Sequence, residues 1–121
     1  MFDHVTLRVP DLALAAADLK AALDELQIDQ TTDTATFAVW GNLAFTRSDE
    51  DHPITQRVHI AFVAPSQAGV DRFWQAGIDA GFIDDGPAGP RPDYADDYYA
   101  AFLKDDAGNS FEAVHRDGER P

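Results

Sequence analysis

The stretches His4-Val5-Thr6-Leu7-Arg8-Val9-Pro10 and His59-Ile60-Ala61-Phe62-Val63-Ala64-Pro65 share one layout and lie 55 positions apart. Each begins with a histidine, carries apolar residues at every second position, and ends at a proline. The same offset gives seven identities in twenty-six positions between residues 4–29 and 59–84. The sequence therefore predicts a duplicated unit with one strand histidine in each copy.

The composition is that of one folded domain. With 121 residues, 45% of them apolar, the chain can bury a core but is too short for two ordinary domains. It has no cysteine, which excludes disulfides, thiolate ligands and a cysteine nucleophile. The sequence contains no apolar run of membrane-spanning length and does not begin with a signal-like segment. We therefore expect a cytoplasmic protein.

The chain is strongly acidic. Nine basic and 22 acidic side chains give a formal net charge of −13. Such a charge repels the phosphates of nucleic acids and of anionic membranes at long range. We therefore expect neither a nucleic acid nor a membrane as a partner.

The pattern of strands and helices is β-α-β-β-β, twice. In the first unit we expect a helix at residues 12–26 and strands at residues 2–9, 30–33, 35–40 and 42–47. In the second unit we expect a strand at 57–64, a helix between Ser66 and Gly81, a strand from about 82, and a hairpin of residues 98–104 and 109–115. A loop rich in glycine and proline covers residues 86–92.

These elements predict an α+β fold. Its two βαβββ units, about residues 1–48 and 57–117, are joined by an acidic linker. They are expected to form a cupped mixed sheet with the helices on its outer face.

Three side chains fall on the face of their strands that points away from the helices: His4, His59 and Glu112. If the two units close into one cup, all three point inward. Imidazole and carboxylate groups are suitable ligands for Zn²⁺, Fe²⁺, Mn²⁺, Co²⁺ or Ni²⁺, and three protein ligands leave open positions for a substrate. A single strand histidine is more often an ordinary surface or core residue, so the joint pattern carries the hypothesis.

The stretch Tyr98 to Glu112 resembles the vicinal oxygen chelate superfamily, which includes glyoxalase, bleomycin-resistance and extradiol dioxygenase proteins. Its residues fit the ending Tyr-Tyr-x-x-Phe-x-x-Asp-x-x-Gly-Asn-x-x-Glu, although the turn Asp105-Asp106-Ala107-Gly108-Asn109 departs from the usual Asp-Pro-Asp-Gly-Asn. The resemblance implies that His4, His59 and Glu112 hold a divalent metal ion. It also implies that the ion chelates adjacent oxygens of a small substrate and stabilises a developing negative charge.

The first unit is expected to supply no fourth metal ligand. Aligning the two turns at their Gly-Asn pairs puts Phe45 where the second unit carries Glu112. Phe45 cannot ligate, and the resemblance then argues against lactoylglutathione lyase, which has a four-ligand pattern with two acidic residues. Dioxygenase, isomerase, other lyase and thiol-transferase reactions stay open. The candidates for the general base are Glu112 and a metal-bound hydroxide.

Substrate contacts are expected from a basic and aromatic cluster before the last hairpin. Arginine binds carboxylate or phosphate, and phenols donate or stack. Tyr98 and Tyr99 have opposite parity, so only one of them can face the cup. Trp40 and Phe45 either form an apolar wall of the cup or pack in the core, and the sequence favours neither. The candidate substrate-binding residues are Arg91, Tyr94, Tyr98, Tyr99, Trp40 and Phe45.

Three functions remain open on the sequence alone. The leading expectation is a metal-dependent enzyme acting on a small oxygen-bearing molecule. The alternative is a metal-free protein that binds or sequesters a small molecule or antibiotic, as bleomycin-resistance proteins do; an accessory domain ranks last. By resemblance we also expect a homodimer, in which the cup is either complete within one chain or shared between two.

Overall fold

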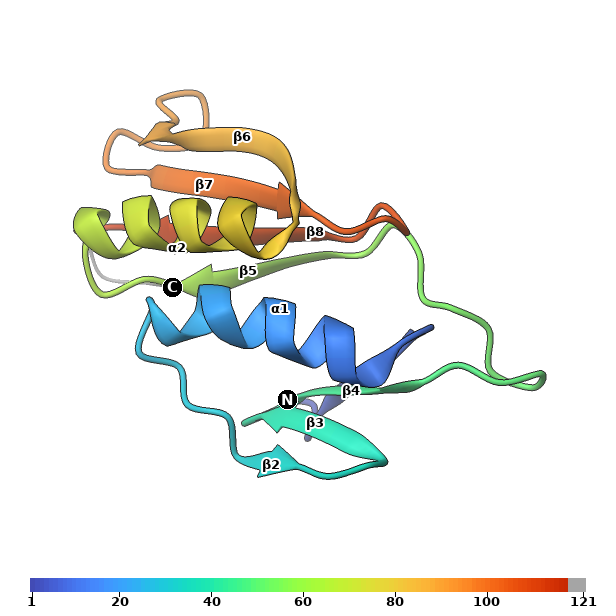
Figure 1. Cartoon of the computed structure of the whole chain (residues 1–121). Coiled ribbons are helices and arrows are strands. Elements are labelled where there is room, and N and C mark those ends of the chain that lie inside the picture. The colour runs from blue at the N-terminus through green and yellow to red at the C-terminus, as the bar shows by residue number, and fades with distance from the viewer. Residues whose placement is uncertain (118–121) are drawn as a thin grey trace.

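A computed structural model describes residues 1–117 and contains two β-α-β-β-β units (Figure 1). The helices and strands are, in chain order, β1 (Val5–Val9), α1 (Leu12–Asp24), β2 (Thr32–Asp33), β3 (Phe37–Trp40), β4 (Leu43–Arg47), β5 (His59–Val63), α2 (Gln67–Ala80), β6 (Ile83–Pro90), β7 (Tyr99–Lys104) and β8 (Ser110–His115). The predicted α+β fold of two βαβββ units is confirmed.

Each unit forms its own four-stranded mixed sheet. The strand orders are β1-β4-β3-β2 and β5-β8-β7-β6. In both sheets the first strand of the unit runs parallel to the last, and the other neighbouring strands are antiparallel. As a result β1 and β5 each lie at the edge of a sheet, and β4 and β8 lie beside them.

The helix ends follow from local hydrogen bonding. The side chain of Asp11 accepts a hydrogen bond from the backbone N–H of Leu14, and that of Ser66 accepts one from Gly69. Both residues are therefore N-caps. Gly81 follows α2 as its C-cap. No helix within residues 1–117 has the length and apolar character needed to cross a membrane.

The two units share one core. Helices α1 and α2 lie side by side and pack against each other (Figure 1), and the buried apolar side chains of both units form a single cluster. Phe45 of β4 and Phe111 of β8 contact each other within it, with ring centroids 6.3 Å apart. The helix-facing sides of both sheets are thus buried together.

The opposite faces of the sheets point away from this core. On β1, Leu7 and Val9 are buried, whereas Thr6, which precedes Leu7, is exposed and Arg8 between them is half-buried. On β5, His59 and Ala61 are exposed, and Ile60 packs against the core. Both histidine-bearing faces are therefore accessible, and they lie on two separate four-stranded sheets of the chain.

One expected loop is partly a strand. β6 continues to Pro90, although residues 86–92 are rich in glycine and proline. Its pairing with β7 shifts register between Asp84 and Gly86 and again between Gly86 and Gly89. Such bulges let β6 stay beside β7 although few of its residues pair. The glycine- and proline-rich composition alone does not indicate this pairing.

We expect Gly77→Ala to destabilise the fold. An added Cβ would lie 2.1 Å from Cδ1 of the fully buried Leu103, so α2 would have to move away from β7. Overpacking of this kind costs about 1–3 kcal/mol, which exceeds the gain in helix propensity of at most about 1 kcal/mol. Urea unfolding measures the difference. The exposed Gln75→Ala in the same helix serves as control and should change stability by no more than about 0.5 kcal/mol; an unchanged midpoint for Gly77→Ala would contradict the packing.

Candidate functional site

A histidine and a buried glutamate meet on the exposed face of the second sheet. Strands β5 and β8 are parallel neighbours, and Ala61 pairs with Glu112. His59 lies two residues before Ala61 on the same face, and its Nε2 is 2.8 Å from Oε1 of Glu112. The Glu112 side chain is 3% exposed and that of His59 is 52% exposed. A buried carboxylate is thus joined to an imidazole that solvent or a ligand can reach.

Tyr98 occupies the second carboxylate oxygen. Its hydroxyl donates a hydrogen bond to Oε2 of Glu112. Burial, together with the hydrogen bond and charge of Glu112, raises the pKa of Tyr98 to about 12. The phenol therefore stays protonated at neutral pH and acts as a donor that fixes the orientation of the carboxylate.

Three further residues complete this face. Oγ of Ser110 lies 3.0 Å from Nδ1 of His59, and the ring of Phe102 stacks on the imidazole with centroids 6.1 Å apart. The guanidinium carbon of Arg116 is 5.8 Å from the centroid of the Tyr98 ring. The sequence analysis did not include them among the site residues. The signal was present, because Ser110, Phe102 and Arg116 have the parity of Glu112 and Tyr98 on their strands.

Two of the predicted substrate contacts border the same face. The guanidinium carbon of Arg91 lies 5.4 Å from the centroid of Phe102. Tyr94 is 63% exposed and its ring meets that of Tyr98 edge to face, at 5.0 Å. The loop between β6 and β7 thus brings a cation and a second phenol to the edge of the His59–Glu112 pair.

Tyr99 lies on the other face of β7. Its hydroxyl donates a hydrogen bond of 2.5 Å to Asp71 on α2, which raises the pKa of Tyr99. The opposite parity of Tyr98 and Tyr99 is confirmed, and of the two only Tyr98 reaches Glu112. Tyr99 therefore lies on the α2 side of β7, away from the His59–Glu112 pair.

Trp40 and Phe45 lie in the core, and the prediction that Phe45 faces the cup is wrong. Both side chains are 3% exposed, and their rings contact each other at 5.6 Å. Phe45 pairs with the buried Leu7, so it points toward the helices. Core packing, the other explanation considered for these two residues, is the one found.

Register explains this error. Ala44 pairs with Thr6 as Glu112 pairs with Ala61, so Ala44 is the true counterpart of Glu112. The connection between β3 and β4 is two residues long, whereas the one between β7 and β8 has five. Aligning the two turns at Gly-Asn therefore slips the register by one, which moves each side chain to the other face. Ala44, like Phe45, has no group that can ligate a metal.

His4 does not join the pair within one chain. It precedes β1, its side chain is 59% exposed, and its Nδ1 lies 2.7 Å from Oδ1 of Asp3. Within residues 1–117 no three histidine or acidic side chains are placed to hold one metal ion. A single chain therefore brings together two of the three predicted ligands, His59 and Glu112.

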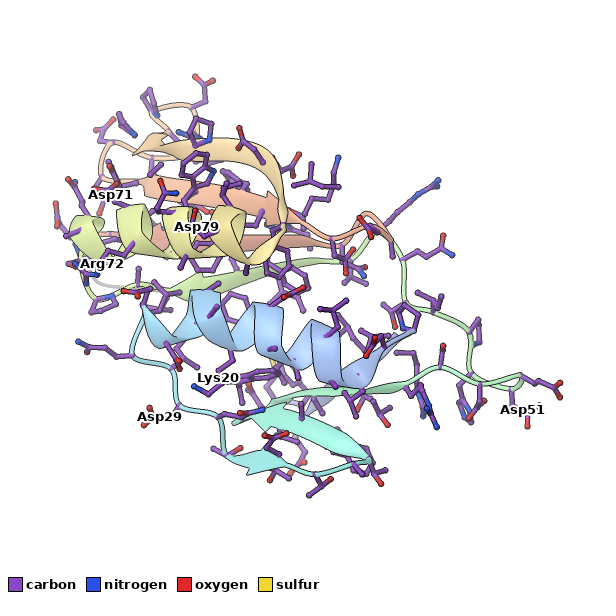
Figure 2. The ribbon with its side chains drawn as sticks, in the orientation of Figure 1. Lys20, Asp29, Asp51, Asp71, Arg72 and Asp79 are labelled. Atoms are coloured by element: carbon purple, nitrogen blue, oxygen red, sulfur yellow. The ribbon has the colours of Figure 1, made fainter. Side chains whose placement is uncertain are left out.

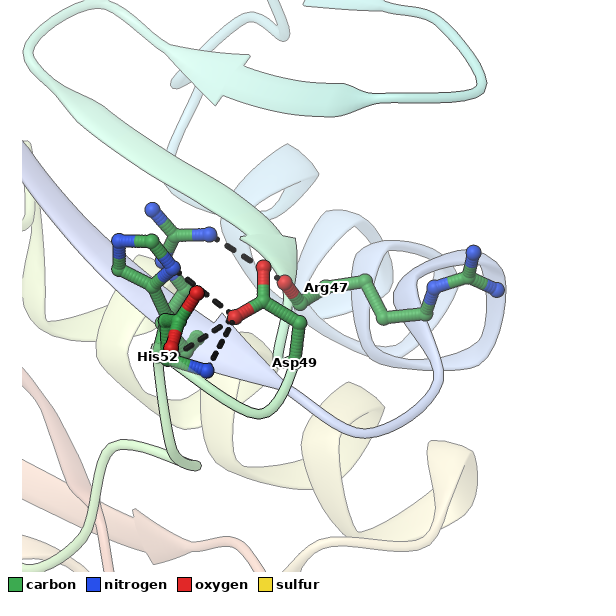
Figure 3. A network of polar contacts seen from close by, with 5 residues as sticks. Arg47, Asp49 and His52 are labelled. Atoms are coloured by element: carbon green, nitrogen blue, oxygen red, sulfur yellow. Dashed lines mark hydrogen bonds and ion pairs between the residues drawn. The ribbon is translucent and has the colours of Figure 1, made fainter.

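The other two histidines have structural contacts. His52 lies in the linker, with its backbone N–H and its Nδ1 within 2.9 Å of Oδ1 of Asp49 (Figure 3). The hydrogen bond from His52 lowers the pKa of Asp49. Nδ1 of His115 lies 3.0 Å from the carbonyl oxygen of Ala64. Neither residue contacts Glu112.

The geometry of the pair fits two ligands of one metal ion. Bonds from nitrogen or oxygen to such ions are about 2.0–2.2 Å long, so two neighbouring ligand atoms lie about 3 Å apart. The Nε2–Oε1 separation of 2.8 Å is close to this value. The pair combines the donor types that bind first-row divalent metals.

Comparison with solved structures identifies relatives along nearly the whole chain. A glyoxalase/bleomycin resistance protein from Albidiferax ferrireducens is 30% identical, with a TM-score of 0.78, and the match covers 96% of this chain and 99% of the other. A glyoxalase-related enzyme from Fulvimarina pelagi is 17% identical, with a TM-score of 0.74, over 96% of this chain and 88% of the other.

A third relative was solved with a metal. It is the fosfomycin resistance protein FosX from Listeria monocytogenes, in complex with Mn(II) and 1S,2S-dihydroxypropylphosphonic acid. It is 20% identical, with a TM-score of 0.65, over 98% of this chain and 90% of the other. At this identity the likeness shows the fold alone.

No protein-family model and no curated protein sequence matches the chain. The solved structures nevertheless match the fold over nearly the whole chain. On the strength of the 30% identity over almost the full length of both proteins, the chain belongs to the glyoxalase/bleomycin resistance protein family, within the vicinal oxygen chelate superfamily.

Proposed function

We propose that this protein is a metal-dependent enzyme that binds a divalent cation through His4, His59 and Glu112 and acts on a small oxygen-bearing substrate. The observation that carries the proposal is the contact between Glu112 and His59. Glu112 is almost completely buried, and its Oε1 lies at ligand-to-ligand distance from Nε2 of His59. Burying a carboxylate away from water is costly unless charged or hydrogen-bonded partners compensate it.

The surrounding residues prepare the two ligands. Tyr98 holds Oε2 of Glu112, which leaves Oε1 directed at His59. Ser110 contacts the other nitrogen of His59 and so sets the orientation of the ring. Partners of this kind orient metal ligands and are commonly as necessary as the ligands themselves. A bound divalent cation supplies Lewis-acid stabilisation of negative charge developing on substrate oxygens.

We assign the third ligand to His4 of a second copy, in a homodimer with two shared sites. His4 and His59 lie on sheet faces that both point away from the common core, so one chain does not enclose them together. The edge strands β1 and β5 carry exposed apolar side chains, Val5 at 40% and Val63 at 57%. An open edge with exposed apolar residues favours pairing with another chain. Two such chains, related by a two-fold axis, would build each cup from both partners.

The proposed ligands disfavour one of the reactions known for this superfamily. Lyase, isomerase, dioxygenase and thiol-transferase reactions remain within the proposal, with Glu112 as ligand and candidate base. Ala44 stands where a second acidic ligand would be needed for lactoylglutathione lyase, so that activity is disfavoured. The family name also allows metal-free binding of a small molecule, and the experiment below distinguishes this alternative.

We expect the protein to bind about one divalent ion per chain. Glu112→Gln should weaken this binding by more than about 100-fold, because even the loss of a residue that only orients a ligand costs about 10- to 100-fold. Glutamine preserves the shape of the side chain but removes the negative charge that a cation requires. Untagged, chelator-treated protein is titrated calorimetrically with Mn²⁺, Zn²⁺, Fe²⁺, Co²⁺ and Ni²⁺, and His52→Ala in the linker is the matched control. Parent protein that binds none of these ions, or small ligands that bind equally well in chelator, would favour the metal-free alternative.

Mixing two inactive variants tests the shared site. His4→Ala and His59→Ala should each fail to bind metal at parental affinity. If they are unfolded together and refolded as a mixture, half of the dimers are mixed and each mixed dimer has one intact site. About a quarter of the parental sites should therefore return. No recovery, in a mixture shown by native mass spectrometry to contain mixed dimers, would mean that each site belongs to one chain.

Tyr98→Phe should weaken metal binding by about tenfold while leaving the fold intact. The variant loses the hydroxyl that holds Oε2 of Glu112, so the carboxylate can rotate away from His59. Tyr99→Phe is the matched control, because Tyr99 donates the same kind of hydrogen bond to Asp71 on the helix side of β7. Affinity is measured by calorimetry and ligand geometry by the visible spectrum of the Co²⁺ form. Equal affinities and spectra for both variants would show that Tyr98 does not position Glu112.

A further inference from the structure

Arg91 is joined to the metal-binding face by a row of stacked groups. Its guanidinium lies over the Phe102 ring, 5.4 Å from the centroid, and Phe102 in turn stacks on His59 with an interplanar angle of 30°. Arg91 follows β6, Phe102 belongs to β7 and His59 to β5, so three segments converge. A positive group is thereby held one aromatic ring away from a proposed metal ligand.

Backbone carbonyl groups hold the guanidinium in place. Its Nη2 donates to the carbonyl oxygen of Pro87 at 2.6 Å and its Nη1 to that of Pro90 at 3.3 Å. These bonds use two of the five N–H donors of arginine. Carbonyl groups carry no net charge, so they fix the position of the guanidinium without neutralising it.

Among the described residues, Lys20, Arg72 and Arg116 pair with carboxylates, whereas Arg91, like Arg8 and Arg47, does not. Arg72 lies 3.2 Å from Glu25, and Lys20 lies 2.7 Å from Asp24, at positions labelled on the two helices in Figure 2. Within residues 1–117 no carboxylate oxygen is within 4.0 Å of a nitrogen of Arg91. In a chain with a net charge of −13, this leaves a local positive charge beside the site.

Two glycines of β6, before Arg91, leave room for the guanidinium. A Cβ on Gly86 would lie 3.0 Å from the Phe102 ring and 3.3 Å from Nη2 of Arg91, and one on Gly89 would lie 3.3 Å from Nη1. Gly86 also has a φ of +146°, which L-residues rarely adopt. Both glycines therefore allow the backbone to approach the arginine closely.

We infer that Arg91 binds an oxyanion of the substrate, so that the substrate class is a small carboxylic or phosphonic acid with a neighbouring oxygen. The inference rests on the proposed metal site, which would take the neighbouring oxygen. Arginine binds carboxylate and phosphonate groups through paired N–H donors, and Arg91 has three donors left. Phe102 contacts both the guanidinium and the His59 ring, so Arg91 lies near the proposed metal ligands.

Three small probes that share a secondary hydroxyl group test this inference. Propane-1,2-diol offers two adjacent oxygens without charge, lactate replaces one with a carboxylate, and 2-hydroxypropylphosphonate carries a phosphonate. Metal-loaded protein should bind at least one of the two acids about tenfold or more tightly than the diol. The acid that binds more tightly identifies the anion. Equal binding of all three probes would overturn the inference.

Variants assign the effect to the arginine. Arg91→Gln should lose about 10- to 100-fold in affinity for the acid and nothing for the diol, whereas Arg91→Lys, which keeps the charge but not the planar fork, should lose less. Arg72→Gln, remote from the site and paired with Glu25, is the control. Metal content is measured first for each protein. If the parent binds no metal, the proposed function fails; if all variants bind metal and Arg91→Gln and Arg91→Lys both keep the parental preference for acids, only the role of Arg91 fails.

Discussion

The buried carboxylate of Glu112 is the constraint on which the second sheet depends. A charged side chain that is 3% exposed needs a partner for each oxygen, and here the partners come from the two strands that flank β8. His59 belongs to β5, and Tyr98 immediately precedes β7. The strand order β5-β8-β7 is therefore what allows the charge to be buried. Replacing a buried ion pair by hydrophobic residues is often neutral or stabilising, so a glutamate at position 112 favours a chemical role over a structural one.

The duplication supplies the framework but only half of the chemistry. Both units have the same strand order, and both carry a histidine at the start of their first strand. The position of Glu112 is taken by Ala44 in the first unit, where no carboxylate needs partners. Such asymmetry means that the first unit can offer one imidazole and the second an imidazole with a carboxylate. In the proposed three-ligand centre, the second unit of one chain would be joined by the first unit of another.

Local chemistry determined which features could be predicted from the sequence. The caps Asp11 and Ser66 and the opposite faces of Tyr98 and Tyr99 follow from residue type and from the period of a strand. The face of Phe45 does not, because it depends on the length of the β3–β4 turn, and one residue of register reverses it. Whether His4 meets His59 depends on how the two units pack. That packing is decided by contacts such as Phe45 with Phe111, between residues far apart in the sequence.

The acidity of the chain bears on the kind of substrate that Arg91 can select. At physiological ionic strength, charges more than about 8 Å apart are largely screened, so the net charge of −13 weakens anion binding mainly at long range. Within the site the nearest charges decide. Arg91 is held by neutral carbonyls and so keeps its full charge, and the proposed cation would add to it. An acid with an adjacent oxygen would engage both charges at once, whereas a neutral molecule would engage only the metal. Specificity for an acid on so acidic a protein therefore requires the positive charge to be placed beside the metal ligands, as Arg91 is through Phe102.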